Sequence, residues 1–515
     1  MSENDLRNSG EMEKNISFFH RIQIPKYMIQ KKNYLVAILL VVLILIGEIL
    51  LYKQAFRNLP RDHFEWLSYS EEHFNIGLGL YENGRLENGS YINTERPPGY
   101  PIYVAGILHA RDILLRITSL PSGVSIFGDV FSIMLADNKI AIALSQFFIA
   151  GISAYILFLI INRFLSPKYS LWLLVSYQLN ITFFSLILKI DYSLLETLFI
   201  LLIFYLSRSY IDHSQKYTRK SIILGGFIGI FCLFRPVYLL FPAFFFLFLL
   251  LIQKRWTFSA KHSMIVLLAM LIAMTPNIIR NYLVADKLIL TSEQGGVELY
   301  HNSVVSFFES PEYTDYGKVW GDYGWPLIRD NLGYEKYSGI LWYSDTARIS
   351  ELFWSASIRE LRKQPLVYMT NVIYNVQQII RMDFEYWGYR FYKQSERQIF
   401  GYQAFHIYLT FLQIIGVISL LASLLVTKEP RYRKTMLFLI ALLFISYSLV
   451  YFYPRYIYLK YPLYFISFGA LISCFQSTWK VKTAAMISSI YLLAIFVVGF
   501  IPLAFFSYVV FFLNA

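Results

Sequence analysis

Long apolar runs separated by short polar segments dominate the chain. A helix needs about 20 apolar residues to cross the hydrocarbon core of a membrane, and the runs suffice for about eleven such helices. They lie at residues 34–51, 139–162, 169–188, 192–207, 221–234, 236–253, 263–280, 404–426, 435–452, 457–475 and 484–511. We therefore predict an all-α polytopic membrane protein.

The connections between these runs differ on the two sides of the membrane. Every second connection is short and carries Lys or Arg, which is typical of cytoplasmic loops. The opposite side holds two long segments, which we place outside. The predicted divisions are a cytoplasmic tail at 1–33, a transmembrane catalytic module at 34–282 that includes a first outer loop at 52–138, a large outer loop at 283–402, and C-terminal transmembrane helices at 403–515.

Both outer segments contain apolar stretches that are unsuited to crossing a bilayer. Residues 101–108 form a piece too short to span, and we expect part of that loop to lie along the membrane surface. The large outer loop contains apolar residues at helical spacing, which predicts a helix that either lies on the bilayer or covers a cavity. These residues are Met369, Val372, Ile373, Val376, Ile379 and Ile380.

Composition excludes a soluble enzyme and explains the charge. Only 16% of the 515 residues are charged and 56% are hydrophobic, whereas a soluble chain has about 25% charged residues. The formal net charge of +12 follows from the basic cytoplasmic loops, so we expect no nucleic-acid partner. Richness in Ile, Lys, Asn, Phe and Tyr fits an AT-rich genome and favours a bacterial inner membrane.

The first outer loop supplies candidate acids. Glu71 and Glu72 are adjacent and have aromatic and His neighbours, which favours one carboxyl with a raised pKa that takes a proton from a hydroxyl. A solvated acidic helix face is the alternative. Glu65 and Asp62 lie upstream in the same loop and compete for the role of base.

A rigid turn follows, with the sequence Arg96-Pro97-Pro98-Gly99-Tyr100-Pro101. Its prolines fix the backbone, and Gly99 permits a close approach of another segment. Such a turn either aims the Arg96 guanidinium at a phosphate, for which its planar fork is suited, or starts an interfacial helix with a snorkelling Arg.

Further ionisable residues mark the predicted outer membrane boundary, where they are costly and often functional. Lys189, Asp191 and Glu196 form either a local ion pair or part of a site. Each of the cations beyond them is interpretable as an interfacial anchor, but together they suit an anionic headgroup. These cations are Arg235, Arg280, Arg455 and Lys460.

Taken in order, these motifs resemble the C-type (GT-C) integral-membrane glycosyltransferases, particularly bacterial relatives of dolichyl-phosphate-mannose protein mannosyltransferases and of the lipid A aminoarabinose transferase. The resemblance covers most of the chain. It comprises Glu71-Glu72, Arg96-Pro97-Pro98, Leu195-Glu196-Thr197-Leu198-Phe199, Arg235-Pro236, Arg280-Asn281-Tyr282 with the later Gly295-Gly296, and Arg455-Tyr456. A Walker loop, a Gly-rich dinucleotide turn and HExxH are absent from the sequence.

The resemblance implies transfer of one sugar from a polyprenyl-phosphate carrier to an acceptor hydroxyl of a lipid, glycan or protein at the outer face, with inversion. It implies a carboxylate base, Glu71 by preference, with Glu72 next and with Asp191 competing with Glu196 at the second acidic position. Arg96, helped by Arg280, Arg235 or Arg455, is expected to bind the lipid phosphate near Tyr100 and Lys189. No cofactor is certain, and a divalent metal is left open.

Three other classes of protein share parts of this pattern. A multispanning transporter or lipid flippase is the main alternative, and it favours internal repeats and ionisable groups near the membrane midplane. An enzyme that ligates or polymerises whole glycans and a non-catalytic membrane scaffold are the others.

Overall fold

A computed structural model describes most of the chain. It covers residues 26–58, 71–118 apart from 89, 90, 93 and 95, 137–180, 192–210 apart from 209, 217–334 apart from 315, 346–381, 399–426, 430–449, 460–478, 483 and 486–490.

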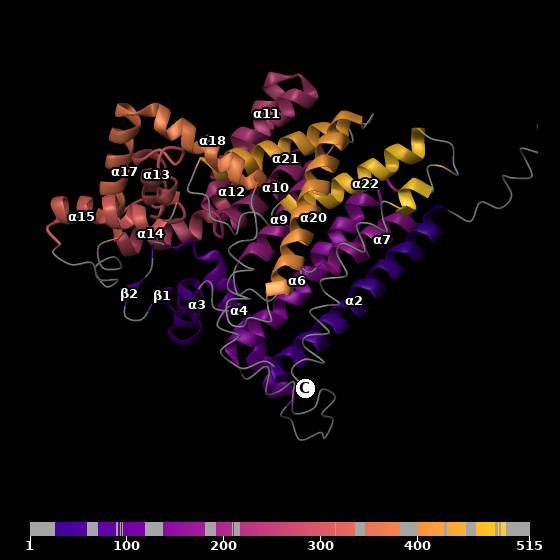
Figure 1. Cartoon of the computed structure of the whole chain (residues 1–515). Helices are drawn as coiled ribbons and strands as arrows, with labels where there is room; N and C mark the ends of the chain where they lie inside the picture. The colour runs from indigo at the N-terminus through magenta and orange to yellow at the C-terminus, as the bar shows by residue number, and fades with distance from the viewer. Residues whose placement is uncertain are drawn as a thin grey trace, which may run out of the picture.

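The regular secondary structure of the described residues is helical except for one small hairpin (Figure 1). The N-terminal part contains α2 (Lys26–Asn58), α3 (Glu71–Asn83), β1 (Glu87–Asn88), β2 (Tyr91–Ile92), α4 (Gly99–Thr118), α6 (Asn138–Ile161), α7 (Pro167–Gln178), α9 (Ser193–Arg208), α10 (Tyr217–Cys232), η3 (Pro236–Leu240), α11 (Phe241–Gln253) and α12 (Trp256–Ala285). The remainder contains α13 (Gly295–Val304), η4 (Pro311–Thr314), α14 (Tyr316–Val319), η5 (Trp320–Gly324), α15 (Trp325–Leu332), α17 (Thr346–Lys363), α18 (Pro365–Arg381), α20 (Ile399–Val426), α21 (Pro430–Ser448) and α22 (Lys460–Thr478). β1 and β2 pair antiparallel.

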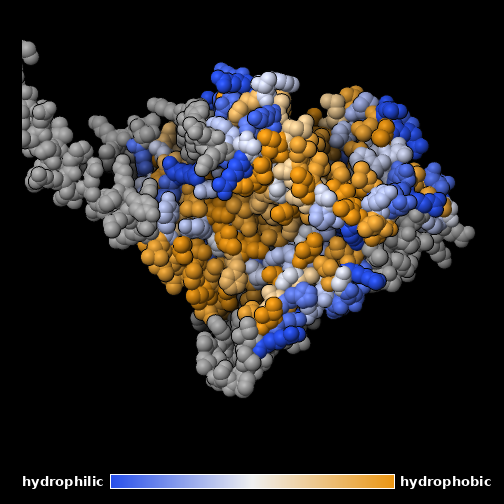
Figure 2. Space-filling model, turned by 180° about the vertical axis from the view of Figure 1, so that it is seen from behind, coloured by the Kyte–Doolittle hydropathy of each residue, from blue (hydrophilic) through white to orange (hydrophobic). Residues whose placement is uncertain are grey.

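Among the described residues, four helical segments are long and apolar enough to cross a membrane: Asn33–Leu50, Asn138–Ile161, Pro236–Gln253 and Trp256–Ala285. Many of their large apolar side chains face outward, and Figure 2 shows a broad hydrophobic surface on one side of the molecule. The chain therefore has the character of an α-helical membrane protein.

Several predicted spans have different boundaries in the structure, among them those predicted at 34–51 and 169–188. α2 begins at Lys26 rather than at residue 34 and continues to Asn58, because Lys, Gln and Met sustain a helix outside the hydrocarbon region. The span predicted at 169–188 does not run through as one helix. α7 ends at Gln178, where Asn180 follows as a residue that favours helix termini.

Glycine spacing sets the closest helix contact in the bundle. Gly225 and Gly229 lie four residues apart on α10, and a Cβ at Gly229 would come 2.5 Å from the carbonyl oxygen of Met270 on α12. A Cβ at Gly225 would meet the Val266 carbonyl in the same way. This small-xxx-small pattern lets the two backbones pack directly, as it does in membrane helix pairs.

The helices of the predicted large outer loop form a group at one side of the bundle (Figure 1). They have a separate small core in which Val297 and Tyr300 of α13 pack near Ile328 of α15 and Phe353 of α17. α13 also packs against α18, and α18 packs against α21. The group is therefore a folded unit attached to the ends of apolar helices.

Candidate functional site

The centre of the candidate site is an ion pair within the first predicted outer loop, between Arg96 and Glu72 at the start of α3. Arg96 donates to Glu72 Oε2 through Nε at 2.8 Å and forms a second contact through Nη2 at 2.6 Å. Its Nη1 donates to Gln294 Oε1 at 2.6 Å. The two charged side chains are 22% and 23% exposed, so this pair remains accessible to a ligand.

The Pro-Pro-Gly turn is fixed against a second turn far along the sequence. The Gly99 backbone N–H donates to the Leu233 carbonyl at 2.7 Å. A Cβ at Gly99 would lie 2.6 Å from the Phe234 ring and 2.8 Å from the Leu233 carbonyl carbon. Glycine is therefore required here by close backbone approach, and this approach sets the position of Arg96 relative to Arg235.

Three aromatic rings, His73, Tyr100 and Tyr192, lie between the two turns, and we refer to them as the aromatic trio. Their centroids are separated by 6.3 Å for His73–Tyr100, 5.5 Å for His73–Tyr192 and 6.1 Å for Tyr100–Tyr192, all edge-on. Tyr100, a predicted binding residue, is buried, and its hydroxyl accepts from Gln146 Nε2 at 3.4 Å. The three rings pack against one another, and His73 directly follows Glu72 in α3.

A second ion pair joins the first turn of α9 to the residue before η3. Arg235 Nε is 3.1 Å from Glu196 Oε2, and the side chains are 9% and 2% exposed. The Tyr238 hydroxyl donates to Glu196 Oε1 at 3.3 Å. The Arg235 guanidinium lies over the Tyr192 ring at 4.2 Å and near the Tyr447 ring at 5.6 Å. The sequence expected Arg235 to help bind lipid phosphate, whereas here it is enclosed by protein groups.

A third contact ties the first loop to the segment before α13. Thr94 Oγ1 donates to Glu293 Oε2 at 2.5 Å, and the Ser350 hydroxyl donates to the Glu293 carbonyl at 2.7 Å. Burial raises the pKa of Glu293 above its ordinary value, although the Thr94 hydrogen bond and the Lys287 charge oppose the shift. Neighbouring residues 293 and 294 thus hold both ends of the Thr94–Arg96 segment.

Arg280, another predicted phosphate ligand, contacts a different part of the first loop. Its Nη2 donates to the Leu86 carbonyl at 3.3 Å and its Nη1 to Asn281 Oδ1 at 2.8 Å. Both contacts are structural, and they position the segment that leads into β1. The structure therefore brings together Arg96 with Glu72 and Arg235 with Glu196, and it places Arg280 at the hairpin.

Several predicted residues lie outside what the structure describes. They are Lys189, Asp191 and Arg455, together with Glu65, Asp62 and the side chain of Glu71, whose backbone begins α3. Lys460 is described. Its Nζ donates to the Ile379 carbonyl of α18 at 3.2 Å and to Gln413 Oε1 at 2.5 Å, which are contacts of a helix-end cation rather than of a headgroup ligand.

Sequence reasoning did not select Gln294, Tyr192, Tyr238 or Tyr447. Gln294 directly precedes the Gly295-Gly296 pair, which was the nearest available signal. The sequence reasoning also missed Glu48, a carboxyl group within the apolar run of α2. Glu48 is 3% exposed, and its carboxyl group interacts with the side chain of Gln178 on α7.

The described part of the chain contains no evident site for a metal ion. No group of three or more His, Cys, Asp or Glu side chains converges there in a way that could hold an ion. Glu72 is committed to Arg96, and Glu196 to Arg235 and Tyr238.

No protein-family model matches the chain, and no curated protein shows significant sequence similarity to it.

Proposed function

We propose that this protein is a membrane glycosyltransferase of the GT-C type. It would transfer a sugar from a polyprenyl-phosphate carrier to an acceptor hydroxyl on the outer side of a membrane, with inversion at the anomeric carbon. About eleven membrane-spanning helices would hold the prenyl chain. The accessible Arg96–Glu72 pair, fixed by Gln294, is the observation that supports this proposal most strongly.

The pair suits a ligand-exchange mechanism. A guanidinium binds phosphate oxygens as well as it binds a carboxylate, through parallel charge-assisted hydrogen bonds. In the structure Glu72 occupies two nitrogens of that fork. The donor phosphate would replace Glu72 on Arg96, and Glu72 would then be released, ionised, beside the bound donor. Binding of the donor would thereby produce the base.

In the transfer step, one bond to the anomeric carbon forms as another breaks. The Glu72 carboxylate accepts the proton of the acceptor hydroxyl while the acceptor oxygen bonds to the anomeric carbon. The bond between that carbon and the phosphate oxygen breaks, and its electron pair remains on the polyprenyl phosphate. Arg96 stabilises the developing charge on the leaving phosphate. Glu71, which the sequence favours as base, is the competing carboxylate.

The buried pair would act as a positioning element in this mechanism. Arg235 and Glu196 neutralise each other away from water, and Arg235 packs on Tyr192 of the aromatic trio. Tyr192 in turn packs on His73, the residue next to Glu72. Substitutions of Arg235 or Glu196 are therefore expected to act through the position of α3 rather than through direct phosphate contact.

Measuring donor binding and turnover in Glu72→Gln distinguishes a role of Glu72 as the base from a role that only holds Arg96 in place. The assay uses purified protein in lipid vesicles, short-chain polyprenyl phosphate for binding and radiolabelled polyprenyl-phosphate sugars with a membrane extract for turnover. We expect Glu72→Gln to bind the phosphate more tightly, because competition for Arg96 is lost, and to lose about 10² to 10⁴ in turnover. Arg96→Ala should lose both binding and turnover.

The matched control is Arg85→Ala, which removes an exposed cation from the same loop and should change neither quantity. If Glu72 only holds Arg96 in place, Glu72→Gln will instead weaken phosphate binding and lower turnover slightly. If Glu71→Gln abolishes turnover while Glu72→Gln retains it, Glu71 is the base. Full turnover in Arg96→Ala would overturn the proposal.

Glu48 favours a second candidate function, a transporter of lipid-linked or anionic substrates. A buried carboxyl group within an apolar helix is costly and commonly belongs to a proton or substrate pathway. That reading predicts that Glu48→Gln stops movement of labelled lipid between leaflets. The transferase reading predicts that Glu48→Gln leaves sugar transfer intact.

A further inference from the structure

Helix α18 has two distinct faces. Leu366, Met369 and Ile373 lie at helical spacing on one face and are 72%, 58% and 52% exposed; we refer to them as the α18 apolar stripe. Asn371 and Asn375 on the other face are fully buried. Ile379 is also buried on this face, but the first three turns of α18 expose apolar residues and bury amides, whereas a soluble amphipathic helix turns its apolar residues toward the protein.

The buried amides hold α18 firmly in this orientation. Asn371 Nδ2 donates to the Asn302 carbonyl at 3.0 Å and to the Val305 carbonyl at 2.6 Å, and Asn371 Oδ1 accepts from the Phe307 backbone N–H at 2.8 Å. Asn375 Nδ2 donates to the Ser448 carbonyl at 3.1 Å. Because these bonds are buried, rotating the apolar stripe inward would leave several polar groups unpaired.

α18 lies across the ends of apolar helices. The Tyr368 hydroxyl donates to the Leu449 carbonyl just after α21 at 2.9 Å, and Lys460 at the start of α22 binds the Ile379 carbonyl. Ile445, one turn before the end of α21, is 43% exposed. The stripe is therefore attached where an outward-facing apolar surface of the bundle ends, at the level expected for a membrane interface.

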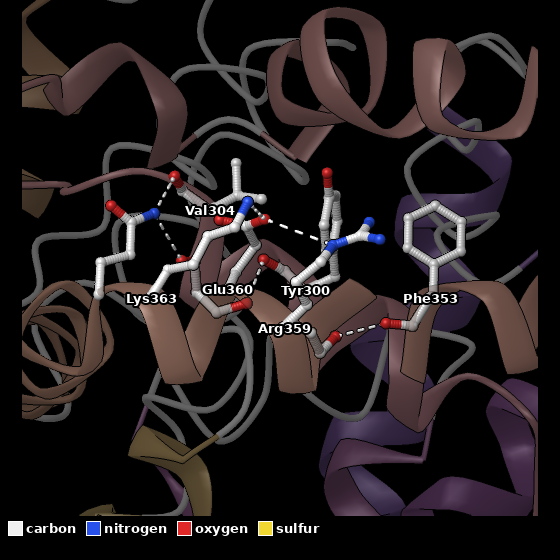
Figure 3. A network of polar contacts seen from close by, with 9 residues as sticks. Tyr300, Val304, Phe353, Arg359, Glu360 and Lys363 are labelled. Carbon is white, nitrogen blue, oxygen red and sulfur yellow. Dashed lines mark hydrogen bonds and ion pairs between the residues drawn. The ribbon is translucent and has the colours of Figure 1, made fainter. Parts of the chain in front are cut away.

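Basic side chains lie at the end of α17, which Gln364 alone separates from α18. Arg359 Nε and Lys363 Nζ lie 3.9 Å and 3.0 Å from Glu360 Oε1, and Figure 3 shows this group together with Tyr300 and Val304 of α13. Both cations are exposed, as is Arg362. Three cations and one anion, three or more residues before the exposed Leu366, match the combination that binds anionic lipid headgroups and acyl chains together.

We propose that α18 lies in the interface of the lipid bilayer. Its apolar stripe enters the boundary between headgroups and acyl chains, and Arg359, Arg362 and Lys363 contact anionic headgroups. The interaction is independent of the proposed transferase activity. The buried face of α18 binds α13 through Asn371, and α13 begins directly after Gln294, the partner of Arg96. Contact of α18 with the bilayer would therefore hold this side of the candidate site at the membrane surface.

Site-specific fluorescence tests the position of the stripe. The chain has only two cysteines, Cys232 and Cys474, and replacing both with Ala allows one environment-sensitive dye to be attached at Met369→Cys. Ile373→Cys is a second stripe position, and Asp330→Cys on α15 is the exposed control. The full-length protein is placed in phosphatidylcholine vesicles with and without phosphatidylglycerol, and quenching by nitroxide-labelled lipids is compared with quenching by aqueous iodide.

We expect both stripe positions to be quenched by the nitroxide lipids and to be several-fold less accessible to iodide than Asp330→Cys. Phosphatidylglycerol should strengthen the lipid quenching, and replacing the three cations with Gln should remove that increase. Iodide quenching of the stripe equal to that of the control would place α18 in water and overturn the proposal. Protection from both quenchers would instead indicate that protein, such as a second copy, covers the stripe.

Discussion

The buried ion pair between Arg235 and Glu196 gives a sharp test of how the site is assembled. Its side chains are 9% and 2% exposed, its N–O distance is 3.1 Å, and Tyr238 supplies a further hydrogen bond to the carboxylate. Removing one partner of such a pair leaves an uncompensated buried charge, which costs about 3–5 kcal/mol. That corresponds to about 10²- to 10⁴-fold in the folding equilibrium.

Glu196→Gln and Arg235→Gln should therefore each be strongly destabilising, whereas the double variant should be much more stable than the sum of the two effects predicts. Unfolding can be followed with a thiol-reactive dye, because Cys232 and Cys474 are buried free cysteines and Cys232 lies three residues before Arg235. Arg329→Gln is the matched control. It breaks an exposed pair with Asp330, at 54% and 60% exposure, which should contribute at most about 1 kcal/mol.

Additive effects in the double variant would show that Arg235 and Glu196 do not stabilise each other. A single variant as stable as the wild type would refute the assignment of this pair as a buried structural element.

Three further predictions concern other parts of the molecule. Gly99→Ala should cost about 1–3 kcal/mol through the clash with the Phe234 ring and the Leu233 backbone, whereas Gly106→Ala, which meets nothing within 4 Å and lies inside α4, should be at least as stable as the wild type in the same assay. Burial raises the pKa of Glu293, so its protonated form stabilises the fold below the ordinary carboxyl pKa, and this stability is lost as pH rises through the raised pKa. The melting temperatures at pH 5 and pH 8 should therefore differ less in Glu293→Gln than in the wild type. An unchanged difference would contradict this prediction. Glu48→Met should raise the melting temperature, because burying the Glu48 carboxyl costs more than its interaction with Gln178 returns, and a large decrease would show that the interaction outweighs the cost of burial.

Elements that depend on local sequence were predictable. The apolar run containing Arg235-Pro236 divides into α10 and α11 with η3 between them, as the proline indicates, and apolar spacing predicted α18. The ends of helices were less predictable. α2 extends past both ends of its apolar run. The thickness of a membrane sets the length of the apolar segment, but the helix can continue outside the membrane.

The arrangement of the site depends on contacts that local patterns do not encode. Arg96 and Gln294 are 198 residues apart, and the approach of Gly99 to Leu233 joins two turns from separate helices. The sequence selected both Arg96 and Arg235 as candidate ligands but did not predict that Arg235 is enclosed while Arg96 is accessible. That difference in exposure comes from the packing of Tyr192, Tyr238 and Tyr447, which sequence spacing does not reveal.

Consumption of a purified polyprenyl-phosphate sugar by the protein in lipid vesicles tests the central claim most directly. The account predicts that the wild type, supplied with a membrane extract as acceptor, transfers the radiolabelled sugar and releases polyprenyl phosphate, and that Arg96→Ala does neither while Arg85→Ala does both. An intact donor across a panel of sugars, together with passage of the labelled lipid across the bilayer, would contradict the account and identify the protein as a transporter.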